Sequence, residues 1–77
     1  MSWKTENEKL VKEFEFKNFL EAIDFVNKIV PLAEATDHHP DILIHSYKKV
    51  KITLFTHSKN KITGKDYELA KKIDGIK

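Results

Sequence analysis

The sequence contains no cysteine, and this absence limits both how the chain is stabilised and where it is expected to work. Disulfide bonds are excluded. A chain of 77 residues buries only about 60–65% of the surface that its unfolded form exposes, so its core is thin and self-association is a usual additional support. The lack of thiols also fits a reducing compartment, and we expect a cytoplasmic protein.

Arginine is absent too, since all 14 basic residues are lysine. Arginine supplies the planar fork that reads guanine edges and grips phosphates in pairs, whereas lysine attracts polyanions with little specificity. The lysines are interleaved with acids, and the net charge is only +2. No face is therefore dedicated to nucleic acid, and the lysines are expected to form a solvated surface.

A long apolar run is missing as well. The longest apolar segment is a few residues, too short to span a membrane, and the first residues lack the apolar core of a signal peptide. No membrane partner is expected. Because there is no linker, repeat or low-complexity tract, residues 1–77 are expected to form a single domain.

Two strands are expected before the first helix. Within residues 11–16, two phenylalanines alternate with two glutamates, which is typical of a half-buried strand. A shorter strand over residues 3–7 is expected to precede it, with a turn near Glu8-Lys9 between them.

A helix is expected to begin at Asn18, a favoured N-cap, because Glu21 follows three residues later and completes a capping box. Apolar residues that recur every three or four positions predict the stripe that faces the core: Phe19, Ile23, Val26, Val30 and Ala33. Pro31 cannot donate a hydrogen bond to the Asn27 carbonyl, so the helix either kinks or restarts there.

Two further strands follow a loop over residues 37–40, where the residue before a proline favours extended backbone. Residues 42–47 and 49–56 are expected to pair through a tight turn near Tyr47-Lys48. In the second strand, alternation places one aliphatic row on one side: Val50, Ile52 and Leu54. His57 is expected at the end of this strand, on the side away from the aliphatic row.

The final helix is expected to begin at Thr63, and Asp66, three residues later, makes a capping-box-like pair with it. Its buried stripe comprises Leu69, Ala70, Ile73 and Ile76. The order strand, strand, helix, strand, strand, helix favours an α+β sandwich, a four-stranded antiparallel sheet with two helices packed on one face. The uncovered face would suit a second subunit.

The histidines are the most informative residues that are present. All four lie within residues 38–57, and imidazole, with a pKa of about 6.5, can both donate and accept a proton near neutrality. If His38, His39 and His57 converge beside carboxylates, they could move protons on a small molecule.

Each candidate also has an ordinary structural interpretation when it is considered alone. The His38-His39 pair could be loop filler, His57 a surface side chain and Asp66 a helix cap. The remaining candidates could be a helix end, a packing residue with an exposed hydroxyl and a surface histidine: Glu34, Tyr47 and His45. A metal site is less favoured, because neighbouring histidines seldom bind one ion and no HxxxH or CxxC partner exists.

The joint spacing resembles the signature of the pterin-4a-carbinolamine dehydratases. That signature is an acid, three residues, His-His-Pro, six residues, an aromatic, nine residues, His, eight residues and Asp; this chain meets it with Glu34, His38-His39-Pro40, Tyr47, His57 and Asp66. Similar segments extend from residue 3 to residue 73: Phe14-x-Phe16-x-x-Phe19, Val50-x-Ile52-x-Leu54-x-Thr56-His57 and Ile62-Thr63-x-x-Asp66-x-x-Leu69-Ala70. The chain departs from the family at Pro31, at Ile42, where an aromatic is common, and in lacking the usual N-terminal helix before the tryptophan.

The resemblance implies an enzyme that removes water from 4a-hydroxytetrahydropterin and gives quinonoid dihydropterin for tetrahydropterin recycling. It implies no cofactor, and a homodimer or homotetramer formed through the sheet. By resemblance, His38 and His57 would be the acid/base pair, His39 would bind the ring, and Asp66 would hold His57 in its productive tautomer. The substrate-binding positions would be Glu34, Asp37, Thr56 and Ser58.

A second class of function remains open from the sequence. Some relatives in this family also act as dimerisation cofactors of a transcription factor, through their helical surface, so the chain could be a protein-interaction module. It could also be a pterin-binding protein without catalysis, or a zinc hydrolase. The intact histidines and Asp66 favour the enzyme, because a scaffold does not need all of them.

Overall fold

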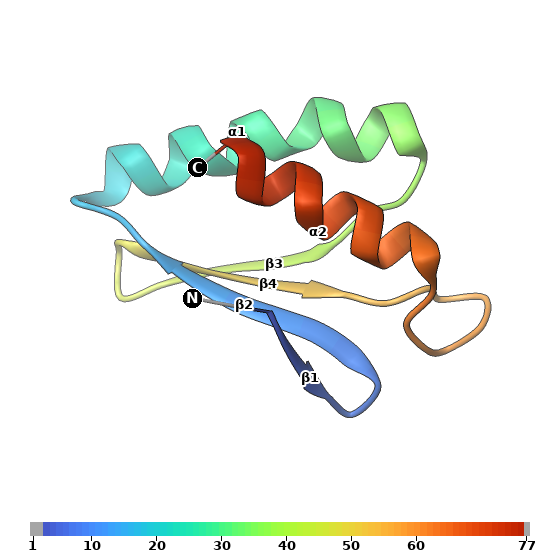
Figure 1. Cartoon of the computed structure of the whole chain (residues 1–77). Coiled ribbons are helices and arrows are strands. Elements are labelled where there is room, and N and C mark those ends of the chain that lie inside the picture. Colours follow the sequence, from blue (N-terminus) through green and yellow to red (C-terminus); the bar gives the residue numbers. More distant parts are fainter. Residues whose placement is uncertain (1–2, 77) are drawn as a thin grey trace.

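The structure, a computed structural model, describes residues 3–76 and has the expected order of elements. Its elements are β1 (Lys4–Glu6), β2 (Lys9–Glu15), α1 (Phe19–Thr36), β3 (Asp41–His45), β4 (Lys49–Leu54) and α2 (Gly64–Ile76). The strands form one antiparallel sheet in the order β1-β2-β4-β3, and both helices cover the same face of it (Figure 1). The prediction of an α+β fold is confirmed.

Two tight turns without glycine close the hairpins. Asn7 and Glu8 both have positive φ, 51° and 60°, and join the paired ends of β1 and β2. This is the left-handed pair of a type I′ turn, whose twist matches that of the strands. The turn therefore lies one residue earlier than predicted, and Lys9 belongs to β2. Between β3 and β4 the turn runs from Ser46 to Lys48, since His45 pairs with Lys49, and it contains the predicted Tyr47-Lys48; Ser46 and Tyr47 also have positive φ, 51° and 52°.

The core lies between the sheet and the helices, and β4 is its centre. Val50, Ile52 and Leu54 are completely buried, as the alternation predicted. They pair with Phe14, Lys12 and Leu10 of β2, respectively, and two of these partners are also buried. From α2, the buried residues are Asp66, Leu69, Ala70 and Ile73, so three of the four predicted positions are core and Ile76 packs at its edge.

Asn18 caps the N-terminus of α1 as predicted, but the return bond of the capping box reaches Lys17 instead of Asn18. The Asn18 side chain accepts a hydrogen bond from the Glu21 amide at 2.9 Å. The Glu21 carboxylate accepts from the amide of Lys17 at 3.1 Å, one residue before the cap. Two amides at the start of the helix are thereby satisfied by side chains, which fixes where the helix begins.

The predicted buried stripe of α1 is wrong for most of its positions. Phe19 and Val30 are 52% and 50% exposed. The residues that face the core are Ala22, Phe25, Ile29 and Ala33, with Val26 and Leu32 packed beside them. This helix is apolar over much of its circumference, so two stripes one position apart have the same helical period. Periodicity alone could not choose between them.

Pro31 does not interrupt α1, which is one helix over residues 19–36. The prediction that the helix restarts at Pro31 is wrong. Pro31 and Asn27 both lie on the exposed side, where water can bond the carbonyl that the missing N–H leaves free. Within residues 3–76, neither helix is long and apolar enough to cross a membrane.

A lysine on the helix-facing side of the sheet ties the two ends of the chain together. The Lys12 side chain is only 11% exposed, and its ammonium forms a 2.8 Å salt bridge with Asp74 of α2. The other carboxylate oxygen of Asp74 accepts a hydrogen bond from the indole N–H of Trp3 at 3.1 Å. The Lys12 ammonium also lies 4.8 Å from the centre of the Phe14 ring. This contact joins β2, α2 and the residue before β1.

We expect Asp74→Ala to lower the free energy of unfolding by about 1–2 kcal/mol, because it leaves a nearly buried ammonium without its partner. Urea unfolding measures this loss. Asp24→Ala is the matched control, since it removes an exposed salt bridge to Lys28 and should cost about 0.5 kcal/mol or less. Equal losses in the two variants would show that the Asp74 contact stabilises the fold no more than an exposed salt bridge does.

Candidate functional site

The predicted site residues come from segments that meet at one end of the molecule. The loop between α1 and β3 carries the histidine pair, and the segment between β4 and α2 carries Thr56, His57 and Ser58. In Figure 1, the end of α1, the start of β3, the end of β4 and the start of α2 all lie on the same side. The antiparallel connections thus bring together residues that are far apart in sequence.

The backbone conformation at the end of α1 fixes the position of His38. Asp37 adopts the left-handed conformation, with φ 51° and ψ 40°, which aspartate tolerates better than most residues. The His38 amide then donates to the Ala33 carbonyl at 3.2 Å. The Thr36 hydroxyl donates to the Leu32 carbonyl at 2.9 Å. The last turn of the helix is therefore satisfied internally, and the chain leaves it in one defined direction.

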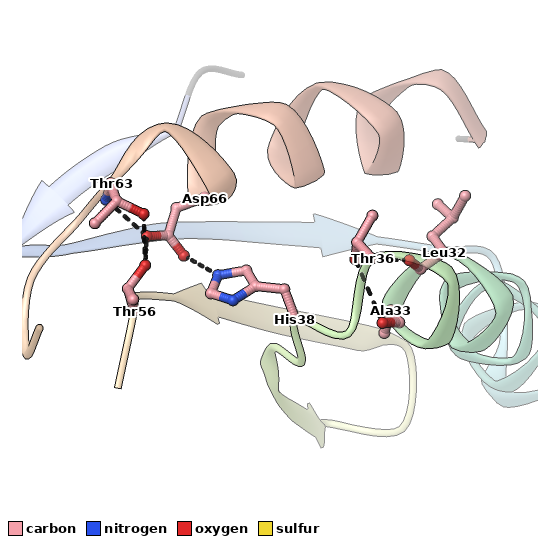
Figure 2. A network of polar contacts seen from close by, with 7 residues as sticks. All are labelled: Leu32, Ala33, Thr36, His38, Thr56, Thr63 and Asp66. Atoms are coloured by element: carbon pink, nitrogen blue, oxygen red, sulfur yellow. Dashed lines mark hydrogen bonds and ion pairs between the residues drawn. The ribbon is translucent and has the colours of Figure 1, made fainter. Parts of the chain in front are cut away.

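Asp66 holds the imidazole of His38. Its carboxylate is completely buried, and one oxygen lies 2.5 Å from Nε2 of His38, which is itself only 8% exposed. The other oxygen accepts the Thr56 hydroxyl at 2.9 Å and the Thr63 amide at 2.8 Å. The two threonine hydroxyls are 2.6 Å apart. Figure 2 shows this network, with the carboxylate between the threonines and the imidazole.

Asp66 lies in the first turn of α2, where backbone amides without a partner in the helix are available to its carboxylate. The hydrogen bond from the Thr63 amide to the Asp66 carboxylate is one of the two bonds of the predicted capping box. The Thr63 hydroxyl, instead of completing that box, bonds the Thr56 hydroxyl. A cap residue has become part of the site, and the capping pattern alone gave no sign of this.

The contact with Asp66 determines which nitrogen of His38 is free. A carboxylate only accepts hydrogen bonds, so Nε2 must carry a hydrogen and Nδ1 is the remaining nitrogen. Within residues 3–76, no buried polar side-chain atom lacks a hydrogen-bond partner. No hydrogen bond from these residues involves Nδ1 of His38, so this nitrogen must reach solvent. The largely buried imidazole therefore keeps one nitrogen without a partner among the described residues.

His57 is not held by Asp66, and the prediction that it would be is wrong. Thr56 is buried and bonds Asp66, so alternation turns its neighbour His57 toward the other side of the sheet. The exposed His57 lies in the turn over residues 57–60, and its ring stacks on Phe55 with 4.1 Å between ring centres. The expectation that His57 projects away from the aliphatic row of β4 agrees with this geometry.

The two histidines of the pair point to different partners. His39 is exposed, and its Nε2 lies 2.6 Å from a carboxylate oxygen of Glu34. Beside this ion pair is a hollow of about 270 Å³, lined by Ile29, Val30, Ala33, Glu34, His39, Pro40 and Ile42. Because side chains alternate along extended backbone, His38 turns inward and His39 outward. Glu34 thus contacts His39, and its role as a substrate-binding position stays a prediction.

Other predicted residues lie outside this cluster or at its edge. Asp37 and Ser58 are exposed in the two loops that border the site. Tyr47 is exposed in the turn at the opposite end of β3, so its prediction as a packing residue is wrong. His45, predicted to be a surface residue, is half-buried and lies 2.5 Å from Glu13 on the uncovered face of the sheet. In the described part of the chain, no three histidine or acidic side chains are placed to hold a metal ion.

Comparisons of sequence identify close relatives. The family model for pterin 4 alpha carbinolamine dehydratase matches residues 1–76. A protein of Sulfolobus acidocaldarius, named as a candidate pterin-4-alpha-carbinolamine dehydratase, is 53% identical over 74 residues, which are 96% of this chain and 80% of the relative. A protein of the same name from a Picosynechococcus species is 54% identical, with 96% and 79% covered.

Comparisons of structure agree. A crystal structure of a protein from Brucella melitensis, described as a transcriptional coactivator/pterin dehydratase, superposes with a TM-score of 0.89 at 36% identity and covers 96% of this chain and 80% of the other. A pterin dehydratase-like protein described as a RuBisCO assembly factor of the alpha-carboxysome superposes with a TM-score of 0.76 at 22% identity, covering 97% and 86%. The second likeness concerns the fold alone.

We expect Asp66→Asn to reverse the tautomer of His38. The Thr63 amide can only donate, so the new side-chain carbonyl should face it and the NH₂ should face Nε2. Nε2 must then accept, and the hydrogen moves to Nδ1. Nitrogen-15 NMR of the neutral imidazole, recorded above the midpoint of its own titration, distinguishes the two tautomers.

Glu34→Gln is the matched control for this experiment, because it makes the same change beside His39 and should leave His38 as in the wild type. If the Asp66→Asn variant kept the hydrogen of His38 on Nε2, the network would not control the tautomer.

Proposed function

Because this chain belongs to the pterin 4 alpha carbinolamine dehydratase family, we propose that it removes water from 4a-hydroxytetrahydropterin. The product would be quinonoid dihydropterin, and the role would be in tetrahydropterin recycling. Histidine side chains would supply the acid and the base.

The reaction needs two proton transfers at neighbouring atoms. The bond between C4a and the hydroxyl oxygen breaks while that oxygen takes a proton and leaves as water. The adjacent ring nitrogen, N5, loses its proton, and its electron pair forms the double bond to C4a. One group must therefore donate a proton and another must accept one, and imidazoles with a pKa near neutrality do both.

The observation that carries this proposal is the state of His38. Its Nε2 is bonded to the buried Asp66 carboxylate, while its Nδ1 has no partner among residues 3–76. The carboxylate fixes the ring orientation and stabilises the imidazolium that forms when Nδ1 takes a proton, as in other acid–base histidines paired with a buried acid.

His57 would be the second member of the acid/base pair. It approaches from the other side of the end of β4, since Thr56 lies between it and the Asp66 network. His39, oriented by Glu34, would bind the pterin ring.

The polar edge of the pterin would meet the two loops that border the site. Asp37 and Ser58 remain the candidates for this contact. Thr56 acts through its hydroxyl instead, because its amide already donates to Lys61 at 2.9 Å and its carbonyl accepts from Asn60 at 2.7 Å. We therefore propose Thr56 as a support for Asp66 and not as a direct ligand of the pterin.

Protein interaction is the second candidate function. The Brucella protein is described as a transcriptional coactivator as well as a pterin dehydratase, and α1 of this chain exposes Phe19 and Leu20. These two side chains lie at the start of α1, whereas the histidine pair follows its end. A dual role would therefore separate by mutation, with Leu20→Lys weakening the interaction and leaving turnover intact.

We expect His38→Ala and His57→Ala each to reduce the rate of dehydration by about 10²–10⁴, the usual contribution of a general acid or base. Chemically generated 4a-hydroxytetrahydropterin is mixed rapidly with the protein, and formation of the quinonoid product is followed by absorbance. The wild type should accelerate the reaction above its rate in buffer.

His45→Ala is the matched control, because His45 is also paired with an acid but lies at the end of β3 away from the loop that carries His38 and His39. It should keep nearly full activity. A folded wild-type protein that gives no acceleration would reject the dehydratase function, and unchanged turnover in both active-site variants would reject the assigned roles.

A further inference from the structure

We propose that Phe55 is a positioning residue that holds the imidazole of His57 for proton transfer; this rests on the dehydratase function proposed above. The Phe55 and His57 rings are 4.1 Å apart between centres and tilted by 37°. No other described aromatic ring contacts His57. Nothing in the dehydratase signature singled out position 55.

His57 needs such a support because its ring has no polar one. His38 and His39 are each oriented by a carboxylate, but within residues 3–76 the His57 side chain has no hydrogen-bond or salt-bridge partner. It is also exposed. An exposed side chain without a partner samples several rotamers, and each rotamer places the proton-carrying nitrogen elsewhere.

The backbone around His57 is already fixed, so only the orientation of its imidazole ring remains free. Thr56, the residue between the two rings, is anchored on the helix side by its bond to Asp66 and by its amide bond to Lys61. The His57 carbonyl accepts a hydrogen bond from the Asn60 amide at 3.3 Å. A stack with Phe55 restricts the two side-chain torsions that these bonds leave free.

Phe55 is itself held by a contact with Lys9 of β2. The ammonium of Lys9 lies 4.5 Å from the centre of the Phe55 ring, within the range of a cation–π contact. Lys9 stands at the start of β2, directly before Leu10, which pairs with Leu54 of β4. The sequence of contacts Lys9, Phe55, His57 therefore anchors a residue of a loop to two strands of the sheet.

Proton transfer requires the imidazole of His57 to be placed accurately. A general base must come within hydrogen-bond distance of the proton that it removes, and a displacement of about 1 Å can cost about 100-fold in rate. An aromatic ring stacks on imidazole in one range of orientations, whereas an aliphatic side chain of similar volume offers no such preference. Phe55→Leu should thus loosen His57 without emptying the space beside it.

Two readouts of Phe55→Leu and Phe55→Tyr test this. In the wild type and in Phe55→Tyr, the ring protons of His57 should show the upfield NMR shift that a stacked aromatic ring produces. Phe55→Leu should lose that shift and lower kcat by about 10- to 100-fold. Rescue by tyrosine separates positioning from loss of packing, and the urea midpoints of the variants confirm that each one is folded.

Phe19→Leu is the matched control, since it is the same substitution at an exposed phenylalanine of α1, and it should change neither readout. If Phe55→Leu kept the wild-type shift of His57, or lost the shift and kept full turnover, Phe55 would not be a positioning residue. A wild type without turnover would reject the dehydratase function instead, and the NMR comparison would then decide alone whether Phe55 holds the His57 ring.

Discussion

The rest of the site depends on the burial of one carboxylate. Asp66 is fully excluded from solvent, and removing a charge from water costs several kcal/mol unless the protein replaces the lost hydration. Three hydrogen-bond partners replace the lost hydration. His38 comes from the loop after α1, Thr56 follows β4, and Thr63 directly precedes α2. These segments must therefore stay together for the charge to be tolerated, and the imidazole is oriented as a consequence.

The three histidines are divided among three kinds of support. His38 has a buried acid, His39 has an exposed acid and His57 has an aromatic ring. The imidazole of His38 is held most firmly, because one of its nitrogens is bonded to a buried carboxylate, whereas the stacked imidazole of His57 is free at both nitrogens. Groups with different surroundings are what a reaction with one proton donor and one acceptor requires, so the division supports the proposed acid/base roles.

The sequence predicts the fold well because its local signals agree with one another. The aliphatic row of β4 and the cap formed by Asn18 and Glu21 are both found as expected. The prediction of the buried face of α1 is wrong because apolar residues occur on more than one side of that helix. Only packing against the sheet selects the side that is buried. The partner of Asp66 could not be derived from spacing, because it depends on the path of the loop after α1. That path is set by the left-handed Asp37. Phe55 had no chemical signal at all, although strand alternation placed it on the same side as His57.

The placement of glycine in this chain is unusual in its consequences. Both hairpin turns use left-handed residues that carry side chains, and both glycines, Gly64 and Gly75, lie inside α2 with ordinary helical backbone. Side chains in the turns limit the conformations of the unfolded chain, while glycine at the first position of α2 makes that turn easier to unwind. The bonds that Asp66 makes to Thr56 and Thr63 act against this fraying. Any event that breaks them would release the start of α2 and the imidazole of His38 at the same moment, so local melting and loss of proton transfer should be one process.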